Sequence, residues 1–366
     1  MWSCSTTIST SPACSSAARC MSRCRWALLA ALVATGCVQS AGATAPGFSK
    51  LVGQTIMTGF SGTQPSAELL ARVRAGEVGG IILFGSNIAN DRSARSLVAR
   101  LQSEAAAGGN PPLLIATDQE GGEVRRFPDG PPDEAEADVT SVGQARANGT
   151  ATGAFLRHVG VNVDLAPVLD SPSSPANFLG SRAYGADPSR NAAFGRAFVT
   201  ALQAQRVAAT AKHFPGLGTA PANTDDGHVW ITTPKSQLDV RLAPFAAAVR
   251  AGVDLVMVSN AGYRGYDPSG LPAVLSRRIV NGLLRKRLGF RGVVISDTMG
   301  APGPSGHADA ALVAVEAGTD VLLELSDEQS TTAFRQLFAA AKSGKLPLAD
   351  LRAADARIAK LKSSLR

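Results

Sequence analysis

Val253-Asp-Leu-Val-Met-Val258 and Gly292-Val-Val-Ile-Ser296 are two short apolar runs, separated by an amphipathic segment, Ser276–Leu288, that has helical spacing. Near-continuous apolar runs of this kind are typical of strands that are buried on both faces of a parallel sheet. A polar residue follows or ends each run, Ser259 after the first and Asp297 after the second. The segment therefore predicts a strand, a crossover helix and a second, parallel strand.

The same unit repeats along the chain from residue 48 onward. The predicted strands are Gln54–Phe60, Gly80–Phe84, Leu113–Thr117, Val161–Leu165, Ala208–Lys212, Val253–Val258, Gly292–Ser296 and Asp320–Glu324. Further predicted helices between them include Ser93–Ala107, Asn191–Gln205, Pro244–Ala251 and Ala308–Ala317. An open doubly wound sheet is the alternative, but the first strand is not followed by a Gly-x-Gly-x-x-Gly fingerprint, and no Walker-type loop is present. We therefore predict an α/β fold, a single (β/α)8 TIM barrel over residues 48–366.

Charge and cysteine placement exclude some classes of protein. The net charge is +7, but Arg19, Arg23 and Arg25 supply three of these charges ahead of Cys37. The remaining chain has no cluster of basic residues with interleaved aromatics, so we expect no nucleic-acid partner. All five cysteines lie within residues 4–37, which excludes a disulfide framework and a cysteine metal site in the body.

The N-terminal segment has the pattern of an export signal. A basic stretch begins at Met21, an apolar run covers Trp26–Ala34, and Thr35-Gly36-Cys37 follows. Cys37 resembles the lipidated cysteine of a bacterial lipobox, although Ala34 stands where Leu is favoured. We expect residues 1–37 to be a signal peptide that starts at Met1 or Met21, and residues 38–47 to be a flexible linker. The predicted location is the extracytoplasmic side of the cell membrane, through a lipid on Cys37, with plain secretion as the alternative.

Polar residues end or follow the predicted strands, where a TIM barrel places its active site. Asp118 follows the third strand, Lys212 and His213 close the fifth, and Asp297 follows the seventh. Asp164 and Asp170 flank the end of the fourth strand. Any one of these charges could equally be a paired structural ion.

Four segments together resemble family 3 glycoside hydrolases, and among them the bacterial single-domain β-N-acetylglucosaminidases. They are Thr117-Asp-Gln-Glu-Gly-Gly-Glu-Val-Arg-Arg126, Asn177-Phe-Leu-Gly-Ser-Arg-Ala-Tyr-Gly185, Ala211-Lys-His-Phe-Pro-Gly-Leu-Gly218 and Val294-Ile-Ser-Asp297. The resemblance covers the body from Leu51 to the C-terminal helix. It implies that Asp297 is the nucleophile, and that the sugar is held by Asp118, Arg126, Arg182, Lys212 and His213. A retaining glycosidase needs such a carboxylate, and nearby cations such as Lys212 would favour its ionised form.

The general acid/base is where the chain departs from the family pattern. The single-domain relatives use a histidine from an Asp-Ser-His motif, whereas this chain has Asp226-Gly227-His228 slightly further along. A histidine oriented by an aspartate suits proton transfer near neutral pH, and Gly227 would let the loop move. We expect the Asp226/His228 dyad to act, but another alignment places Asp225 at this position.

The resemblance predicts an exo-acting β-N-acetylglucosaminidase (EC 3.2.1.52) on GlcNAc-containing muropeptides, without cofactor or metal. Its alternatives are a β-glucosidase, a phosphorylase, or an inactive glycan-binding lipoprotein, which the altered acid/base loop would motivate. A serine hydrolase is not favoured, because Ser259 and Ser296 lack a plausible paired His and Asp.

Overall fold

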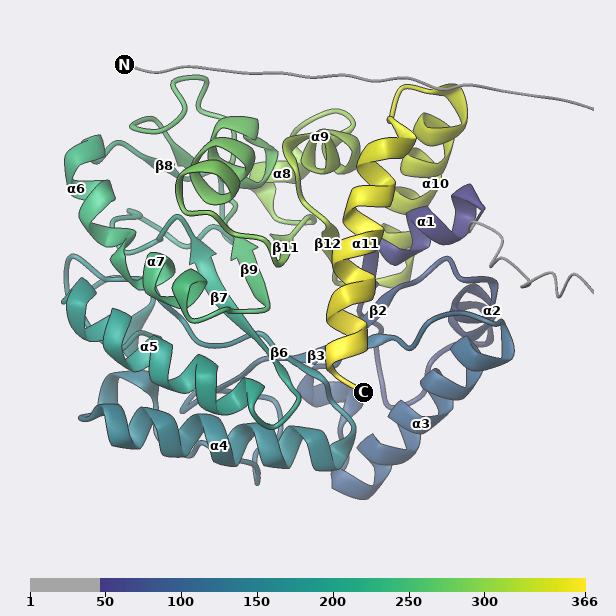
Figure 1. The fold of residues 1–366 in the computed structure, drawn as a ribbon, viewed down its shortest axis with the longest axis horizontal. Helices are drawn as coiled ribbons and strands as arrows, with labels where there is room; N and C mark the ends of the chain where they lie inside the picture. The colour runs from purple at the N-terminus through teal and green to yellow at the C-terminus, as the bar shows by residue number, and fades with distance from the viewer. Residues whose placement is uncertain (1–46) are drawn as a thin grey trace, which may run out of the picture. The chain divides into compact units, whose positions relative to one another are not determined.

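A computed structural model describes residues 47–366, and these residues form a closed barrel of eight parallel strands surrounded by helices (Figure 1). The barrel strands are β1 (Ile56–Thr58), β2 (Gly80–Ile82), β3 (Leu114–Thr117), β6 (Val163–Asp164), β7 (Ala208–Phe214), β9 (Leu255–Val258), β11 (Val293–Thr298) and β12 (Val321–Glu324). The predicted (β/α)8 fold is confirmed. The predicted signal peptide and Cys37 lie outside the described residues.

Each barrel strand pairs with the next barrel strand along the chain. The barrel closes where β1 pairs with β12, with Ile56 opposite Leu322. The helices are α1 (Phe48–Gln54), α2 (Ala67–Ala75), α3 (Asp91–Ala107), α4 (Val142–Val159), α5 (Pro188–Gln203), α6 (Lys235–Arg241), α7 (Ala243–Arg250), α8 (Pro302–Ser305), α9 (Ala310–Ala317), α10 (Asp327–Ser343) and α11 (Leu348–Ser364). The helix predicted over Ser276–Leu288 forms as a π-helix, η5 (Arg278–Arg287).

Two small sheets lie outside the barrel, and the sequence pattern did not predict them. The antiparallel hairpin β4 (Gln119–Gly121) and β5 (Val124–Arg125) follows β3. Its turn requires glycine, because Gly121 has a φ of +104° and a Cβ there would lie 2.3 Å from the carbonyl oxygen of Glu134. The second sheet pairs β8 (Trp230–Ile231) with β10 (Gly262–Tyr263) in parallel.

Alternation of side chains along the strands separates two apolar layers. One layer fills the space between the strands and the surrounding helices. The other fills the barrel interior with residues such as Met57, Val163 and Ile295, and it also contains Ile358, Leu361 and Leu365. The last three belong to α11 and the residue that follows it, so this helix completes the interior packing (Figure 1).

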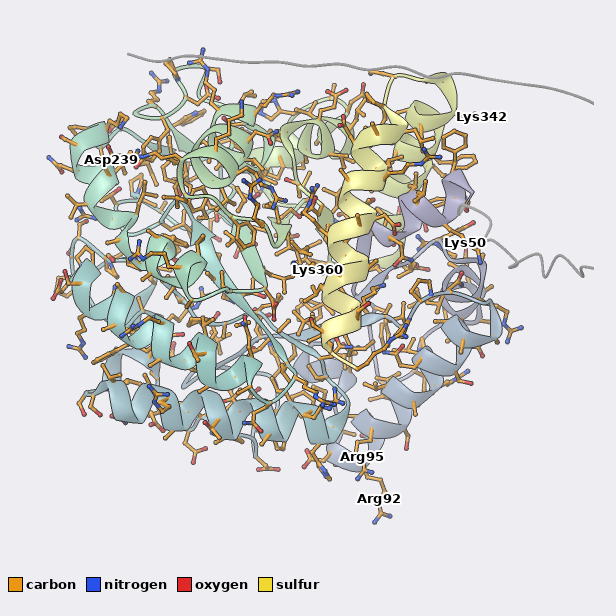
Figure 2. All side chains as sticks on the ribbon, in the orientation of Figure 1. Lys50, Arg92, Arg95, Asp239, Lys342 and Lys360 are labelled. Atoms are coloured by element: carbon orange, nitrogen blue, oxygen red, sulfur yellow. The ribbon has the colours of Figure 1, made fainter. Side chains whose placement is uncertain are left out.

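The outer faces of the helices carry the charged residues, as amphipathic spacing predicts. Arg92 and Arg95, for example, extend outward from α3 (Figure 2), whereas Leu97 and Leu101 of the same helix are buried. Within residues 47–366, no helix combines the length and apolar character needed to cross a membrane.

Candidate active site

A cavity of about 240 Å³ gathers side chains from the ends of several barrel strands and the loops that follow them. Six of the predicted site residues line it: Asp118, Arg126, Arg182, Lys212, His213 and Asp297. Asp225 also lines it. Apolar contacts come from residues such as Phe84, Met257 and Leu323. The structure therefore brings together the predicted nucleophile and every predicted sugar-binding residue.

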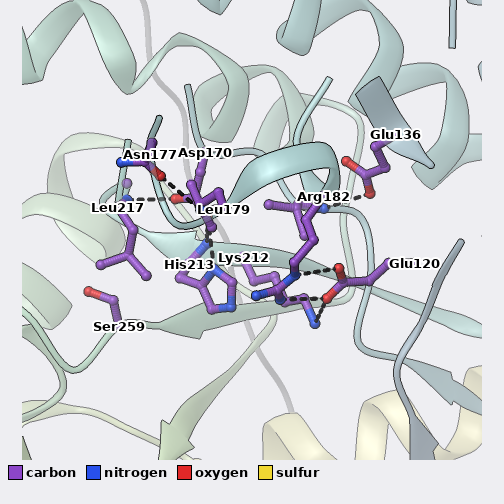
Figure 3. A network of polar contacts seen from close by, with 12 residues as sticks. Glu120, Glu136, Asp170, Asn177, Leu179, Arg182, Lys212, His213, Leu217 and Ser259 are labelled. Carbon is purple, nitrogen blue, oxygen red and sulfur yellow. Dashed lines mark hydrogen bonds and ion pairs between the residues drawn. The ribbon is translucent and has the colours of Figure 1, made fainter. Parts of the chain in front are cut away.

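Lys212 of β7 is buried between two carboxylates. Its Nζ lies 2.7 Å from Oδ1 of Asp118. It also lies 2.7 Å from Oε1 of Glu120 (Figure 3). Arg182 donates two hydrogen bonds to the same Glu120, from Nε at 2.8 Å and from a terminal nitrogen at 2.7 Å. Such a two-pronged contact fixes the guanidinium in one orientation. Glu120 is thus shared by the two cations, and Asp118 contacts Lys212 as well.

The charge of Glu120 depends on this arrangement. Burial alone would raise the pKa of its carboxyl, but Lys212 and Arg182 outweigh burial and lower the pKa to about 2. The pKa of Lys212 is raised, since Asp118 and Glu120 outweigh the effect of burial on the ammonium. An ionised, balanced network of this kind offers strong donors and acceptors to sugar hydroxyls.

Glu120 was not predicted as a site residue, although the sequence carries a signal for it. Asp118 and Glu120 are two positions apart in extended backbone, which places their side chains on the same face. Both reach Lys212 for that reason. Recognising the hairpin would have grouped the two acids.

Asp170, which follows β6, fixes the segment that ends β7 (Figure 3). Its Oδ2 lies 2.8 Å from Nδ1 of His213 and also accepts the backbone N–H of His213 at 3.2 Å. Its Oδ1 accepts the backbone N–H of Leu217 at 2.6 Å. The buried Asp170 carboxylate therefore fixes the orientation of the His213 imidazole. It also holds the start of the loop that follows β7.

Asp297 lies in β11 and faces the cavity without an ion pair to any of the described residues. Its Oδ1 accepts the backbone N–H of Thr298 at 2.7 Å. Burial raises the pKa of Asp297, and the charge of Asp225 adds to that effect, whereas His213 and Lys212 oppose it. The cations expected to favour its ionised form are thus nearby, but burial outweighs them.

The predicted acid/base residues lie on the loop between β7 and β8, and the structure separates them. Asp225 lines the cavity, whereas His228 lies in a neighbouring hollow and stacks on Trp230 with ring centroids 5.7 Å apart. Asp226 and His228 are both exposed, and no hydrogen bond between them occurs among residues 47–366. The predicted Asp226/His228 dyad is therefore not assembled in this conformation.

No group of three or more His, Asp or Glu side chains in the part of the chain that the structure describes is placed to hold a metal ion. The site's polar groups instead form ion pairs with one another around one small cavity. The arrangement suits recognition of a polyhydroxylated ligand next to a carboxylate that is free to react.

Comparison with known proteins identifies the class. The family described as "Glycosyl hydrolase family 3 N terminal domain" matches residues 49–361. The chain therefore belongs to glycoside hydrolase family 3. A β-hexosaminidase of Xanthomonas oryzae pv. oryzae is 36% identical over 285 residues, which are 73% of this chain and 82% of that protein. An uncharacterised secreted glycosyl hydrolase of Arthroderma benhamiae is 34% identical over 328 residues, which are 86% of this chain and 92% of that protein.

Solved structures agree with this class. The family 3 β-N-acetylglucosaminidase of Paenibacillus sp. FPU-7 superposes with a TM-score of 0.84 at 34% identity, and covers 88% of this chain. This chain spans 63% of that protein. The β-N-acetylhexosaminidase of Beutenbergia cavernae superposes with a TM-score of 0.81 at 33% identity. The match covers 87% of this chain and 99% of that protein. The predicted type, a glycoside hydrolase of the β-hexosaminidase type (EC 3.2.1.52), is confirmed.

Proposed function

We propose that the chain is a retaining exo-β-N-acetylglucosaminidase in which Asp297 forms a covalent glycosyl-enzyme. The observation that carries the proposal is the position of Asp297, at the wall of a cavity lined by paired ions, with no ion pair of its own among the described residues. A volume of about 240 Å³ lies below the ~300–1,000 Å³ of common small-molecule pockets, which favours a single terminal sugar over a long chain.

In the proposed reaction, the Asp297 carboxylate attacks the anomeric carbon while an acid protonates the glycosidic oxygen. The bond to the aglycone breaks, and the aglycone leaves as an alcohol. Water then attacks the glycosyl-aspartate and gives its proton to the same acid/base group, which restores both residues. Lys212, Arg182 and Asp118 hold the hydroxyls of the sugar through both steps.

For the acid/base we propose Asp225, since it shares the cavity with Asp297 in this conformation. The Asp226/His228 dyad stays a prediction that requires the loop to move. Replacing the true acid costs most on unactivated disaccharides and least on aryl glycosides with good leaving groups. Asp225→Ala is expected to show that split, and azide is expected to restore its activity on the aryl substrate. The same split in His228→Ala, with Asp225→Ala unaffected, would assign the role to the dyad.

The test of the whole proposal is hydrolysis of 4-nitrophenyl β-GlcNAc and of GlcNAc-containing muropeptides by the wild type and Asp297→Asn. We expect the variant to lose at least about 1,000-fold in kcat. A fluorinated GlcNAc glycoside should label the peptide that contains Asp297, detected by mass. Faster hydrolysis of 4-nitrophenyl β-glucoside than of the GlcNAc substrate would indicate a β-glucosidase, and a sugar phosphate formed in phosphate buffer would indicate a phosphorylase. No turnover and no label would favour a glycan-binding protein.

We also propose export and lipidation of Cys37, with muropeptides as substrates. The secreted relative supports export, and the lipobox-like sequence supports the anchor. Cys37→Ser is expected to move the protein from the membrane fraction to the soluble fraction of the host. An unchanged distribution would reject the anchor.

A further inference from the structure

A cavity of about 610 Å³ lies beside the starts of β11 and β12, away from the candidate active site. It is bordered by η5, α9 and α11 and shares no lining residue with the catalytic cavity. A TIM barrel carries out its reaction at the opposite ends of its strands. The proposed function therefore does not account for the charged side chains that line this cavity.

One buried acid and two arginines form a core of ion pairs in the wall of the cavity. Oδ2 of Asp320 lies 2.6 Å from Nη2 of Arg285. Oδ1 of Asp320 accepts two hydrogen bonds from Arg357, at 3.0 Å from Nε and at 2.7 Å from Nη2. Asp320 is fully buried, and its single negative charge is divided between the two guanidiniums. Together the three side chains keep a net positive charge.

The wall of the cavity also contains donors that the protein leaves unused. Nη1 of Arg357 makes no hydrogen bond to any of residues 47–366. Thr319 is 1% exposed, and its hydroxyl has no hydrogen-bond partner in the part of the chain that the structure describes. A buried polar group without a partner costs free energy, which is tolerated where a ligand or an ordered water satisfies it.

Three further cations stand at the rim of the cavity. Arg277, Lys286 and Arg291 line it and are exposed, and none of them forms an ion pair with the described residues. Two acids, Glu316 and Asp350, are also exposed there, likewise without an ion pair within residues 47–366. The lining holds five cations and three acids in all, which gives the cavity a net charge of +2.

The cations lie close enough together to affect one another. Burial lowers the pKa of the Arg285 guanidinium, and the charges of Arg357 and Arg291 lower it further, although Asp320 opposes these effects. An anion placed among the three guanidiniums would offset their repulsion. The electrostatics of the cavity therefore favour a negatively charged ligand.

We propose that this cavity is a second ligand site, and that it binds a molecule bearing a phosphate group. A phosphate monoester carries a charge of roughly −1.5 to −2 near pH 7, which matches the net charge of the lining. Its oxygens accept paired hydrogen bonds from guanidiniums, here those of Arg357 and Arg291. The volume lies within the ~300–1,000 Å³ of small-molecule pockets, so the cavity has room for more than the phosphate group.

Two sources present this chemistry, a soluble phosphorylated molecule and the headgroup of an anionic lipid. For the first, the probe is pyrophosphate, titrated calorimetrically into the full chain at low ionic strength. We expect it to bind, and the binding to weaken as salt is added. For the second, the probe is sedimentation with vesicles of phosphatidylglycerol, compared with vesicles of phosphatidylcholine. A lipid anchor would bind both kinds of vesicle, so the comparison cancels its contribution.

Substitutions at the rim locate the binding. Arg291→Gln and Lys286→Gln should each weaken pyrophosphate binding by about threefold to fivefold, and the double variant by about tenfold or more. Both side chains are exposed and form no ion pair among the described residues, so the thermal midpoint should not change. Arg352→Gln is the matched control, because Arg352 is exposed on α11 and does not line the cavity. It removes the same charge and should leave binding unchanged.

Pyrophosphate binding that the rim substitutions weaken and the control does not would support a soluble ligand. Preferential binding to phosphatidylglycerol vesicles, lost in the same variants and displaced by pyrophosphate, would assign the phosphate to a lipid. The proposal is overturned if the wild type binds neither probe, if the rim variants bind as tightly as the wild type, or if Arg352→Gln weakens binding as much as they do. None of these measurements involves turnover, so their outcome is separate from that of the proposed function.

Discussion

Glu120 links the ion pairs of the site to the stability of the whole chain. It is buried with Lys212 and Arg182, and its pKa of about 2 lies below the ordinary value of 4.5. A carboxyl whose pKa is lowered on folding stabilises the folded state above its ordinary pKa. That contribution is lost as the pH falls from about 4.5 toward about 2.

Glu120→Gln is expected to lower the free energy of unfolding at pH 7 by roughly 3 kcal/mol, because it leaves two buried cations with fewer partners. The difference from the wild type should shrink as the pH falls through the window from about 4.5 to about 2. Urea unfolding at several pH values measures both effects. Glu123→Gln is the matched control, since Glu123 is exposed in the same hairpin. A difference that does not vary with pH would show that Glu120 acts by packing alone.

Replacing Asp170 is expected to change activity as well as stability. Asp170→Asn keeps one acceptor oxygen but replaces the other by an amide N–H₂, so it cannot accept from both His213 and Leu217 as now. We expect kcat/KM on 4-nitrophenyl β-GlcNAc to fall by at least about tenfold, with weaker inhibition by free GlcNAc. An unchanged inhibition constant would show that His213 does not need this partner to hold the sugar.

At the scale of elements, the loop between β7 and β8 is closely packed at Gly218 and has open space around Gly227. Gly218 packs so closely that a Cβ would lie 1.9 Å from the backbone oxygen of Ser171, whereas a Cβ on Gly227 would meet no atom within 4 Å. Gly218 and Gly227 lie on either side of Asp225 in the sequence.

Gly218→Ala is therefore expected to lower both the thermal midpoint and kcat, because the loop must shift away from Ser171. Gly227→Ala should leave the free energy of unfolding within about 0.5 kcal/mol of the wild type, as at an ordinary surface position. Thermal unfolding and steady-state kinetics measure the pair. Equal effects of the two substitutions would contradict this account of the loop.

The barrel strands could be predicted from sequence because each is a short apolar run followed by a polar residue, as at β11. The strand ends then identified Lys212, His213 and Asp297 as neighbours. The β4–β5 hairpin could not be predicted in this way, since its two strands are polar and very short. Nor could the stacking of His228 on Trp230, because that contact depends on the path of a loop rather than on any periodic pattern.

At the scale of the whole molecule, the candidate site and α11 lie at opposite ends of the barrel. The site lies where the strands end, whereas α11 contributes Ile358 and Leu361 to the interior layer. Lys362 of α11 donates to Oε1 of Gln54 at 2.7 Å and to the backbone oxygen of Gly79 at 2.9 Å. Gly79 precedes β2, so α11 covers the end of the barrel from which the strands start.

Ile358→Ala is expected to destabilise the protein by about 2–5 kcal/mol, since Ile358 is fully buried. KM for 4-nitrophenyl β-GlcNAc should not change at temperatures where the variant stays folded. Lys360→Ala, an exposed position on the same helix that Figure 2 labels, is the control and should leave stability nearly unchanged. A changed KM in Ile358→Ala would show that the two ends are coupled.

The pairing of β1 with β12 and the packing of α11 into the interior also impose an order on biosynthesis. A ribosome must translate more than 260 further residues after Ile56 before its partner Leu322 exists, and more again before Ile358 does. Until then the first strand has one open edge, and the apolar lumen is uncapped. A nascent chain of this protein should therefore stay sensitive to protease until synthesis of the barrel is almost complete.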